Sequence, residues 1–247
     1  MLTGLRVVLT RTEEQNIPLA QAIEQAGGIP ISFPTMAIES VEHDQALGNA
    51  SNTDILIFTS ANAAAHLKHL PSGAETSYCV AMGPGTAAQI LARGWRVDWV
   101  APKGATTETL LSQLPTDLIK GTNVCLVRGL NGRTMLRTAL ASQVTKLYDL
   151  VVYRRICPDR WSITLPALAD AVVIASIDGF RHWVHLLGPT QLSKWADVPH
   201  LLTSQRQLQL VKSMPCFTQL RCAVAPDPGS VMTALSEWNL LELRKKK

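Results

Sequence analysis

Arginine and hydroxyl-bearing side chains recur at the ends of short apolar runs in this sequence. Arg11 ends LRVVLTR and Arg128 ends NVCLVR, while Ser60 follows DILIFT and Ser176 follows AVVIA. In a parallel α/β sheet, such strand ends meet at one edge, where helix N-termini present free amides to an anion. The pattern predicts a ring of donors for an anionic small molecule. Taken singly, each serine is at least as well explained as a helix cap.

Three more side chains fit the same site. Thr86, after AMGPG, and Ser204, after HLLT, follow two further predicted strands. The segment VRGLNGRTML places Arg133 at a predicted helix start, after Gly129 and Gly132 in the turn. Arginine can bind carboxylate or phosphate through two parallel hydrogen bonds, and glycines let the backbone approach a ligand closely. The alternative is a surface arginine in a turn.

Tyr153 is the candidate for proton transfer. It ends LYDLVVY and precedes Arg154 and Arg155. A tyrosine in such a place usually packs with one end in water. A tyrosine hydroxyl could nevertheless donate a proton to a leaving oxygen.

Other chemistries find little support. GPGTAA fits the GxGxxA pattern of nucleotide-cofactor oxidoreductases, but a tight turn into a helix explains it better. The sequence has no GxxxxGK[ST], HExxH, GxSxG or zinc-type spacing, so ordinary phosphoryl transfer, metallohydrolysis and serine hydrolysis are not indicated. Histidines at 66 and 69, and at 182 and 185, share helical spacing without an acidic or cysteine companion in register, so no metal site is predicted. Five cysteines without CxxC spacing are interpreted as structural thiols.

Composition bounds the remaining choices. The 247 residues are 47% hydrophobic and 17% charged, typical of a globular protein of one or two domains. No apolar run reaches the roughly 20 residues that span a bilayer, and the N-terminus lacks a secretory pattern, so we expect a cytoplasmic protein without a membrane partner. The net charge of +4 arises partly from the basic run at 244–247, a solvated tail rather than a nucleic-acid-binding arm.

The predicted elements that would position these residues occur twice in the sequence, as an internal repeat. The runs ending at Arg11 and Arg128, those before Ser60 and Ser176, and those before Thr86 and Ser204 are each separated by about 120 residues, as is the pair VAPKGATTETLL and VAPDPGSVMTAL. Chance resemblance between apolar strands would scatter these separations. The sequence therefore predicts two similar lobes with a cleft between them.

Short β-branched runs alternate with longer helical patterns, which favours βα units around parallel sheets. We predict five strands in each lobe, with crossings between lobes at 34–39 and 153–158. The predicted strands lie near residues 5–10, 29–33, 54–58, 78–82, 96–100, 123–128, 145–152, 171–175, 199–203 and 221–225, and the predicted helices near 13–26, 61–69, 85–93, 106–114, 132–142, 178–187, 204–213 and 228–237.

The order of TRTEEQ, FPTMAIE, DILIFTSANAA, AMGPGTAAQILARGW, LVRGLNGRTML, VVYRR and VAPDPGSVMTAL resembles the uroporphyrinogen-III synthase family over nearly the whole chain. The second lobe departs most, with ASIDGF and LLTSQRQ in place of the family's usual turns. The resemblance implies two Rossmann- or flavodoxin-like α/β lobes joined by a pair of strands. Lobe A would comprise residues 1–36 and 155–247, and lobe B residues 37–154.

The same resemblance implies a cyclising lyase that converts hydroxymethylbilane to uroporphyrinogen III and water, inverting ring D. The substrate carries its own reactive groups, so no cofactor or metal is expected. The resemblance also implies a monomer. Tyr153 matches the family's tyrosine near the active site and is the expected acid, and Thr86 matches its cleft threonine. The remaining positions are expected to bind the substrate's carboxylates: Ser60, Asn62, Ser176, Ser204, Arg11, Arg128 and Arg133.

Two other functions stay open on the sequence. A non-catalytic two-lobed module could bind a small polyanion and close by a hinge motion. A nucleotide-cofactor oxidoreductase rests on GPGTAA alone.

Overall fold

The computed structural model describes residues 1–102, 104–114, 116–130, 134–159, 164–167, 169–214 and 217–245, with the backbone alone at 116–117 and 239–245. The chain divides into two compact units. Unit 1 comprises Met1–Ala37 and Ile156–Lys247, and unit 2 comprises Ile38–Arg155. Each unit has its own sheet and its own core.

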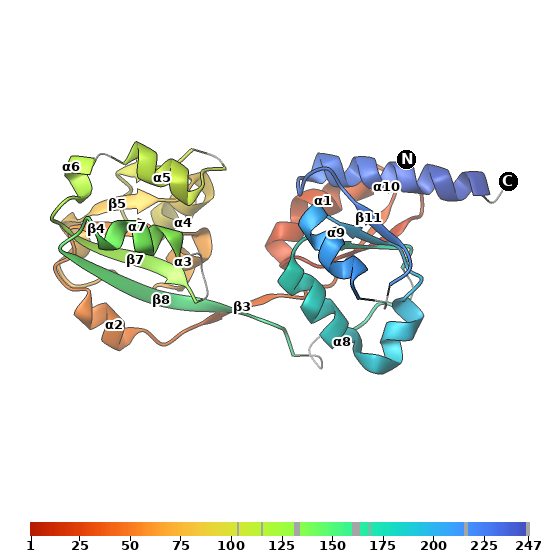
Figure 1. The fold of residues 1–247 in the computed structure, drawn as a ribbon, viewed down its shortest axis with the longest axis horizontal. Coiled ribbons are helices and arrows are strands. Elements are labelled where there is room, and N and C mark those ends of the chain that lie inside the picture. Colours follow the sequence, from red (N-terminus) through yellow and green to blue (C-terminus); the bar gives the residue numbers. More distant parts are fainter. Residues whose placement is uncertain are drawn as a thin grey trace. The chain divides into compact units, whose positions relative to one another are not determined.

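Unit 1 is built on a five-stranded parallel sheet (Figure 1). The strands follow the order β11-β10-β9-β1-β2, and every neighbouring pair runs parallel. Numbered within the unit, this is the flavodoxin-like order 2-1-3-4-5. Its switch point, where successive strands begin to be added on the opposite side, lies between β1 and β9. The strands are β1 (Arg6–Leu9), β2 (Ile29–Ser32), β9 (Ala171–Ile174), β10 (His200–Leu202) and β11 (Leu220–Cys222).

Helices cover both faces of this sheet because strand residues alternate between two cores. Val8 packs with α8 (Ile177–Trp195) and α9 (Gln205–Lys212), whereas Val7 and Leu9 pack with α1 (Glu13–Gln25) and α10 (Pro228–Lys245). In α8, Gly188 has a positive φ of 61° just before Pro189, so this stretch is two helices meeting at a kink. The predicted helix at 178–187 is therefore the first segment alone.

Unit 2 is built on a six-stranded sheet of order β3-β8-β7-β4-β5-β6. The pairs β8/β7, β7/β4, β4/β5 and β5/β6 are parallel. From β4 onward the order corresponds to 3-2-1-4-5, with its reversal between β4 and β7. The strands are β3 (Ala37–Ser40), β4 (Ile55–Phe58), β5 (Tyr78–Ala81), β6 (Trp99–Val100), β7 (Asn123–Gly129) and β8 (Lys146–Ile156).

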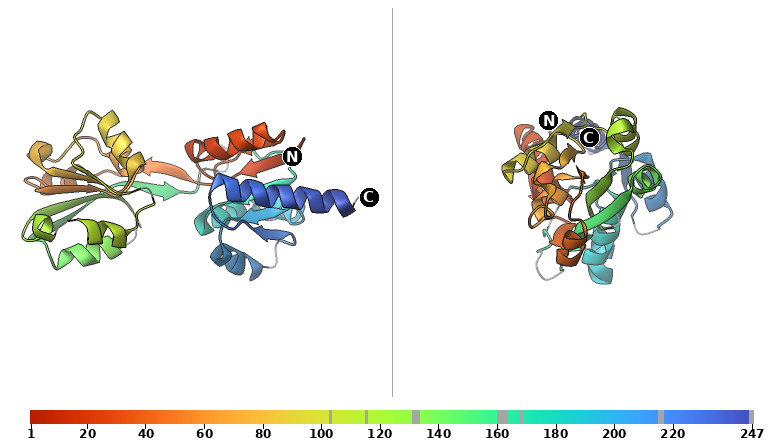
Figure 2. Two further views of the ribbon diagram at one scale, coloured as in Figure 1. Left: turned by 90° about the horizontal axis from the view of Figure 1, so that it is seen from above. Right: turned by 90° about the vertical axis from the view of Figure 1, so that its left-hand side faces the viewer.

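The same alternation gives unit 2 its two helical layers, seen on either side of the sheet in the left view of Figure 2. Leu56 and Phe58 face one core, with α2, α3 and α4, while Ile55 and Ile57 face the other, with α5, α6 and α7. The helices are α2 (Asp44–Asn49), α3 (Ala61–His66), α4 (Pro84–Ala92), α5 (Thr107–Gln113), α6 (Thr116–Ile119) and α7 (Met135–Ala141), with a 3₁₀ turn at Ala74–Thr76.

The internal repeat is confirmed by the topology. The strands that the sequence pairs, β1 with β7, β9 with β4 and β10 with β5, occupy the same places in the two strand orders. The prediction of five strands in each unit was wrong for unit 2, where β3 adds a sixth strand beside β8. The short α2 was also missed, because its six residues are too few to show a helical period.

Candidate functional site

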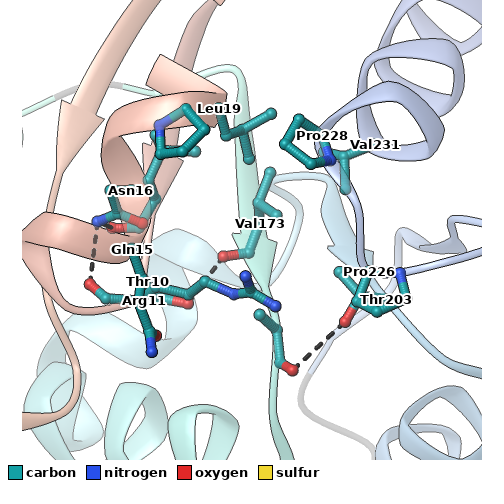
Figure 3. A pocket seen from close by; sticks show the side chains of 13 residues that line it. Thr10, Arg11, Gln15, Asn16, Leu19, Val173, Thr203, Pro226, Pro228 and Val231 are labelled. Carbon is teal, nitrogen blue, oxygen red and sulfur yellow. Dashed lines mark hydrogen bonds between the residues drawn. The ribbon is translucent and has the colours of Figure 1, made fainter. Parts of the chain in front are cut away.

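A hollow of about 220 Å³ lies at the carboxyl edge of the unit 1 sheet, beside the switch point at which the strand order reverses between β1 and β9 (Figure 3). In open α/β sheets this switch point is where ligands bind. Figure 3 shows the Arg11 side chain crossing the end of β9 toward Thr203. The wall is otherwise mostly apolar and comprises Leu9, Thr10, Gln15, Asn16, Pro18, Leu19, Val173, Ala175, Thr203, Pro226, Pro228 and Val231.

Arg11 is the charged group of this hollow. Its guanidinium makes no hydrogen bond or ion pair with any residue that the structure describes. Burial lowers the pKa of Arg11, although a guanidinium remains charged at neutral pH. A partly buried charge without a partner costs free energy, which a bound carboxylate would offset through two parallel hydrogen bonds.

The backbone around Arg11 is fixed by Asn16, which the sequence reasoning missed. Asn16 is 4% exposed and donates its amide to the carbonyls of Leu9, at 3.2 Å, and Arg11, at 2.9 Å. Thr10 donates to the carbonyl of Val173 at 2.8 Å, joining β1 to β9 beyond their last ladder bond. An asparagine within the first turn of a helix was the available signal, since such amides often bond to nearby backbone.

Tyr153 lies beside the switch point of unit 2. Its hydroxyl is 3.1 Å from the hydroxyl of Ser60, which follows β4. The Tyr153 side chain is 4% exposed and packs in the core with Leu150 and Val152. The His66 ring is centred 6.0 Å from the Tyr153 ring, and Ser40 bonds to the His66 Nδ1 at 2.8 Å. The pKa of His66 is lowered by burial.

A β-bulge turns Tyr153 toward Ser60. Arg128 pairs with Val151, but Gly129 pairs with Tyr153, so the register of β7 and β8 slips by one residue. Strict alternation would place Tyr153 and Val152 on opposite faces of the sheet, and the bulge brings both into one core. The prediction that Gly129 lies in a turn was wrong. Gly129 ends β7, and a Cβ added there would lie 2.5 Å from Cζ of Tyr153.

The predicted serines all cap helices. Ser60 accepts from the amide of Ala63 at 3.1 Å, Ser176 from that of Gly179 at 2.8 Å, and Ser204 from that of Gln207 at 3.3 Å. Thr106 also caps its helix, by accepting from the amide of Thr109 at 3.4 Å. The capping explanation is thus confirmed, and only the contact with Tyr153 sets Ser60 apart from the other two serines in the described structure.

Thr86 and Asn62 lie in the first turns of α4 and α3. The GPG segment is a tight turn into α4, with Pro84 at its first position and Gly83 as its cap. Ser204 therefore corresponds in place to Gly83 and not to Thr86. The Thr86 hydroxyl has no hydrogen-bond partner among the described residues, and none of their buried side-chain polar atoms is unsatisfied, so this hydroxyl reaches the surface.

Arg128 differs from Arg11 despite their matching positions. Its Nε donates to Asp149 at 2.7 Å, and Asp149 also accepts from Arg137. Asp149 pairs with Leu126 in the ladder, whereas the corresponding partner of Leu9 is Ser32, which has no carboxylate. The charge of Arg128 is thus already matched within unit 2. Arg133 lies outside the described residues.

The described residues form no recognisable metal site, and their cysteines are free thiols. The described part of the chain contains no cluster of three or more His, Cys, Asp or Glu side chains that could hold a metal ion. Cys79 and Cys125 are free thiols whose pKa is raised to about 12, chiefly by burial. Of the described helices, none combines the length and apolarity needed to cross a bilayer.

Comparison with known proteins places the chain in a family. A family model described as uroporphyrinogen-III synthase HemD matches residues 17–211. The chain belongs to the uroporphyrinogen-III synthase family. A protein of Methanothermobacter thermautotrophicus described as "Putative uroporphyrinogen-III synthase" is 30% identical over 183 residues, covering 70% of each chain.

Solved uroporphyrinogen-III synthases share the fold. A mutant enzyme from Thermus thermophilus superposes with a TM-score of 0.54 at 19% identity, covering 95% of this chain and all of the other. The uroporphyrinogen-III synthetase of Helicobacter pylori gives 0.57 at 14% identity, covering 96% and 98%. These matches confirm the family resemblance inferred from the sequence. Uroporphyrinogen-III synthases are cyclising lyases of tetrapyrrole biosynthesis, so membership of the family favours an enzyme over a binding module.

Proposed function

We propose that this chain closes hydroxymethylbilane to uroporphyrinogen III with Tyr153 as the proton donor and Arg11 as a carboxylate-binding group. The family supplies the reaction. The observation that carries the assignment of roles is that Arg11 follows β1 at the switch point of unit 1, while Tyr153 lies beside that of unit 2. Arg11 is unpaired among the described residues, and Tyr153 is held by a hydrogen bond to Ser60.

The first step breaks the carbon–oxygen bond of the hydroxymethyl group. Electrons from the adjacent pyrrole nitrogen expel the hydroxyl as Tyr153 gives it a proton, so that water leaves, Tyr153 becomes a phenolate, and an electrophilic azafulvenium cation that keeps its N–H remains. Attack by the substituted carbon of ring D then forms a spiro intermediate, which breaks and closes again in the inverted sense. The ring D carbon that forms the new bond then loses its proton, which restores the Tyr153 phenol and completes the macrocycle. Unaided closure at the free carbon gives the type I isomer, so the enzyme's task is chiefly to orient the chain.

The substrate's eight carboxylates call for several donors. We assign one carboxylate to the hollow at Arg11, because Arg11 is the charged side chain among its lining residues. The Thr86 hydroxyl, which reaches the surface although the residue is largely buried, and the amide of Asn62 are further donors in unit 2. Ser176 and Ser204 stand at the starts of helices of eight or more residues, whose free amides favour anions. Arg128 is bound to Asp149 and is the weakest of the candidates.

We further propose that the protein acts as a cytoplasmic monomer without cofactor or metal. The free state of Cys79, Cys125, Cys157 and Cys222 suits a reducing compartment. The substrate's own hydroxyl is the leaving group, so the reaction needs no electron carrier. Size-exclusion chromatography with light scattering would measure the oligomeric state, and a dimer would refute this part of the proposal.

The test is a coupled assay that supplies hydroxymethylbilane, oxidises the products and separates type III from type I porphyrin. The wild-type protein should yield type III, and Tyr153→Phe should lower kcat by about 10- to 100-fold, at or below the lower limit of the effect usual for a lost general acid. Tyr148→Phe is the matched control, since Tyr148 lies on the same strand and packs against the same core without a hydrogen bond to Ser60. An unchanged kcat and isomer ratio in Tyr153→Phe would remove Tyr153 from this role.

A further inference from the structure

The Ser60 hydroxyl has two neighbours, and together they decide what it can do. The amide of Ala63 donates to Ser60 Oγ at 3.1 Å, and Tyr153 Oη lies 3.1 Å from the same oxygen. A serine hydroxyl offers one proton and two acceptor sites. Because the amide occupies one acceptor site, Ser60 keeps a proton and one acceptor site for Tyr153.

Two hydrogen-bond arrangements are then possible. If Tyr153 donates to Ser60, the phenol proton points into unit 2 and is not available to a substrate. If Ser60 donates to Tyr153, the phenol proton is free to be transferred while the phenol oxygen stays held. After the transfer, the phenolate oxygen would accept a charge-assisted hydrogen bond from Ser60, which is roughly twice as strong as a neutral one. Only the second arrangement serves a proton donor.

The rest of the surroundings fixes the ring but does not bond to its oxygen. Gly129 lies under the phenol carbon, and the guanidinium of Arg155 is 6.0 Å from the ring centre. The His66 ring, centred 6.0 Å away, is bonded through Nδ1 to Ser40. Of the described residues, Ser60 is thus the sole hydrogen-bond partner of the Tyr153 hydroxyl.

We propose that Ser60 is a positioning residue, which donates its hydroxyl proton to Tyr153 in the reacting state and does not bind the substrate itself. This inference rests on the proposed role of Tyr153 as the acid and assigns Ser60 a different place from Ser176 and Ser204, which show the capping bond without a phenol partner among the described residues.

The experiment is a double-mutant cycle on kcat at saturating hydroxymethylbilane. Ser60→Ala should lower kcat by about tenfold, the usual effect of losing one hydrogen bond to a group that becomes charged, and should change KM by less than about twofold. In the Tyr153→Phe background, Ser60→Ala should cause no further loss beyond about twofold. Ser60→Thr keeps both the hydroxyl and the cap and should restore most of kcat.

Two further variants separate this role from simple capping. Thr106→Ala removes the cap of α5 in the same unit and should leave kcat unchanged. Should Ser60→Ala fold poorly, Ser60→Gly removes the hydroxyl at a smaller cost to the cap and takes its place.

Each other outcome is decisive. A normal kcat in Ser60→Ala, with Tyr153→Phe slow, would overturn the role of Ser60 alone. Equal losses from Ser60→Ala in both backgrounds, or a large rise in KM, would make Ser60 an independent substrate contact and overturn the inference. A normal kcat in Tyr153→Phe would instead overturn the proposed acid, and with it the inference that rests on it.

Discussion

Replacing Gly129 by alanine should displace the proposed acid. An added Cβ would lie 2.5 Å from Cζ of Tyr153 and 2.8 and 2.9 Å from its Cε atoms, whereas ordinary contact begins at 3.4 Å. The added Cβ is attached directly to the backbone of β7 and cannot move away. The Tyr153 ring must therefore shift by about 1 Å. A retreat of this size can break the 3.1 Å hydrogen bond to Ser60, since such bonds are lost beyond about 3.5 Å.

The expected losses follow from that displacement. A misplacement of 1 Å at a reacting group can cost about 100-fold in rate, so we expect kcat to fall by about 10- to 100-fold with KM little changed. The fraction of type III product should fall as well, because uncatalysed closure gives type I. Overpacking a core in this way costs about 1–3 kcal/mol of unfolding free energy. The coupled assay and urea unfolding measure the two effects.

Gly48 provides the control. It lies in α2 of the same unit, and a Cβ added there would meet no atom within 4 Å. Gly48→Ala should keep kcat and leave stability equal or slightly higher. In a Tyr153→Leu background, which lacks the colliding ring atoms, the stability cost of Gly129→Ala should largely vanish. Wild-type kcat and isomer ratio in Gly129→Ala would refute the reasoning.

Two more predictions concern charge. Arg11→Gln should raise KM by about tenfold with little change in kcat, while Arg206→Gln, an exposed position on α9, should do neither; an unchanged KM would exclude the carboxylate site. The pKa of His200 is lowered to about 4, chiefly by burial, from an ordinary 6.5. Its neutral ring is satisfied, accepting from Trp183 at 3.0 Å and bonding to the carbonyl of Val198 at 2.6 Å. As the pH falls below 6.5, His200 therefore takes up a proton in the unfolded chain but not yet in the folded protein. The free energy of unfolding should be at its full value above pH 6.5 and should fall by about 3 kcal/mol as the pH drops to 4. His200→Gln, which can still accept from Trp183, should flatten this dependence in urea unfolding, and an equally steep curve would contradict it.

Much of the fold was predictable because it is encoded locally. Apolar runs such as ILIF at 55–58 and AVVI at 171–174 form strands as predicted, and all of their residues are buried. Ser60, Ser176 and Ser204 cap helices because a serine before a helix meets its need for an acceptor wherever the helix lies. The repeat predicted corresponding strand positions in the two sheets, since similar βα units wind in the same sense.

Elements with weak local signals were not predictable. β3 has four residues and gains its place only by pairing with β8, and the predicted strand at 96–100 shrinks to Trp99–Val100 at a sheet edge. The kink at Gly188 likewise joins two helices, of which the sequence pattern indicated only the first.

The sequence by itself determined two similar α/β units and the kinds of side chain at their strand ends, because periodicity and capping depend on neighbours along the chain. Only the tertiary structure decided which of those side chains are free to act. Among the described residues, Arg128 is paired because the strand register brings Asp149 close to it. Arg11 is unpaired because the corresponding position in unit 1 is occupied by Ser32, which has no carboxylate. Tyr153 meets Ser60 because a one-residue bulge reverses the face to which alternation would assign it. Register and bulges arise from contacts between distant segments, and no local pattern carries them.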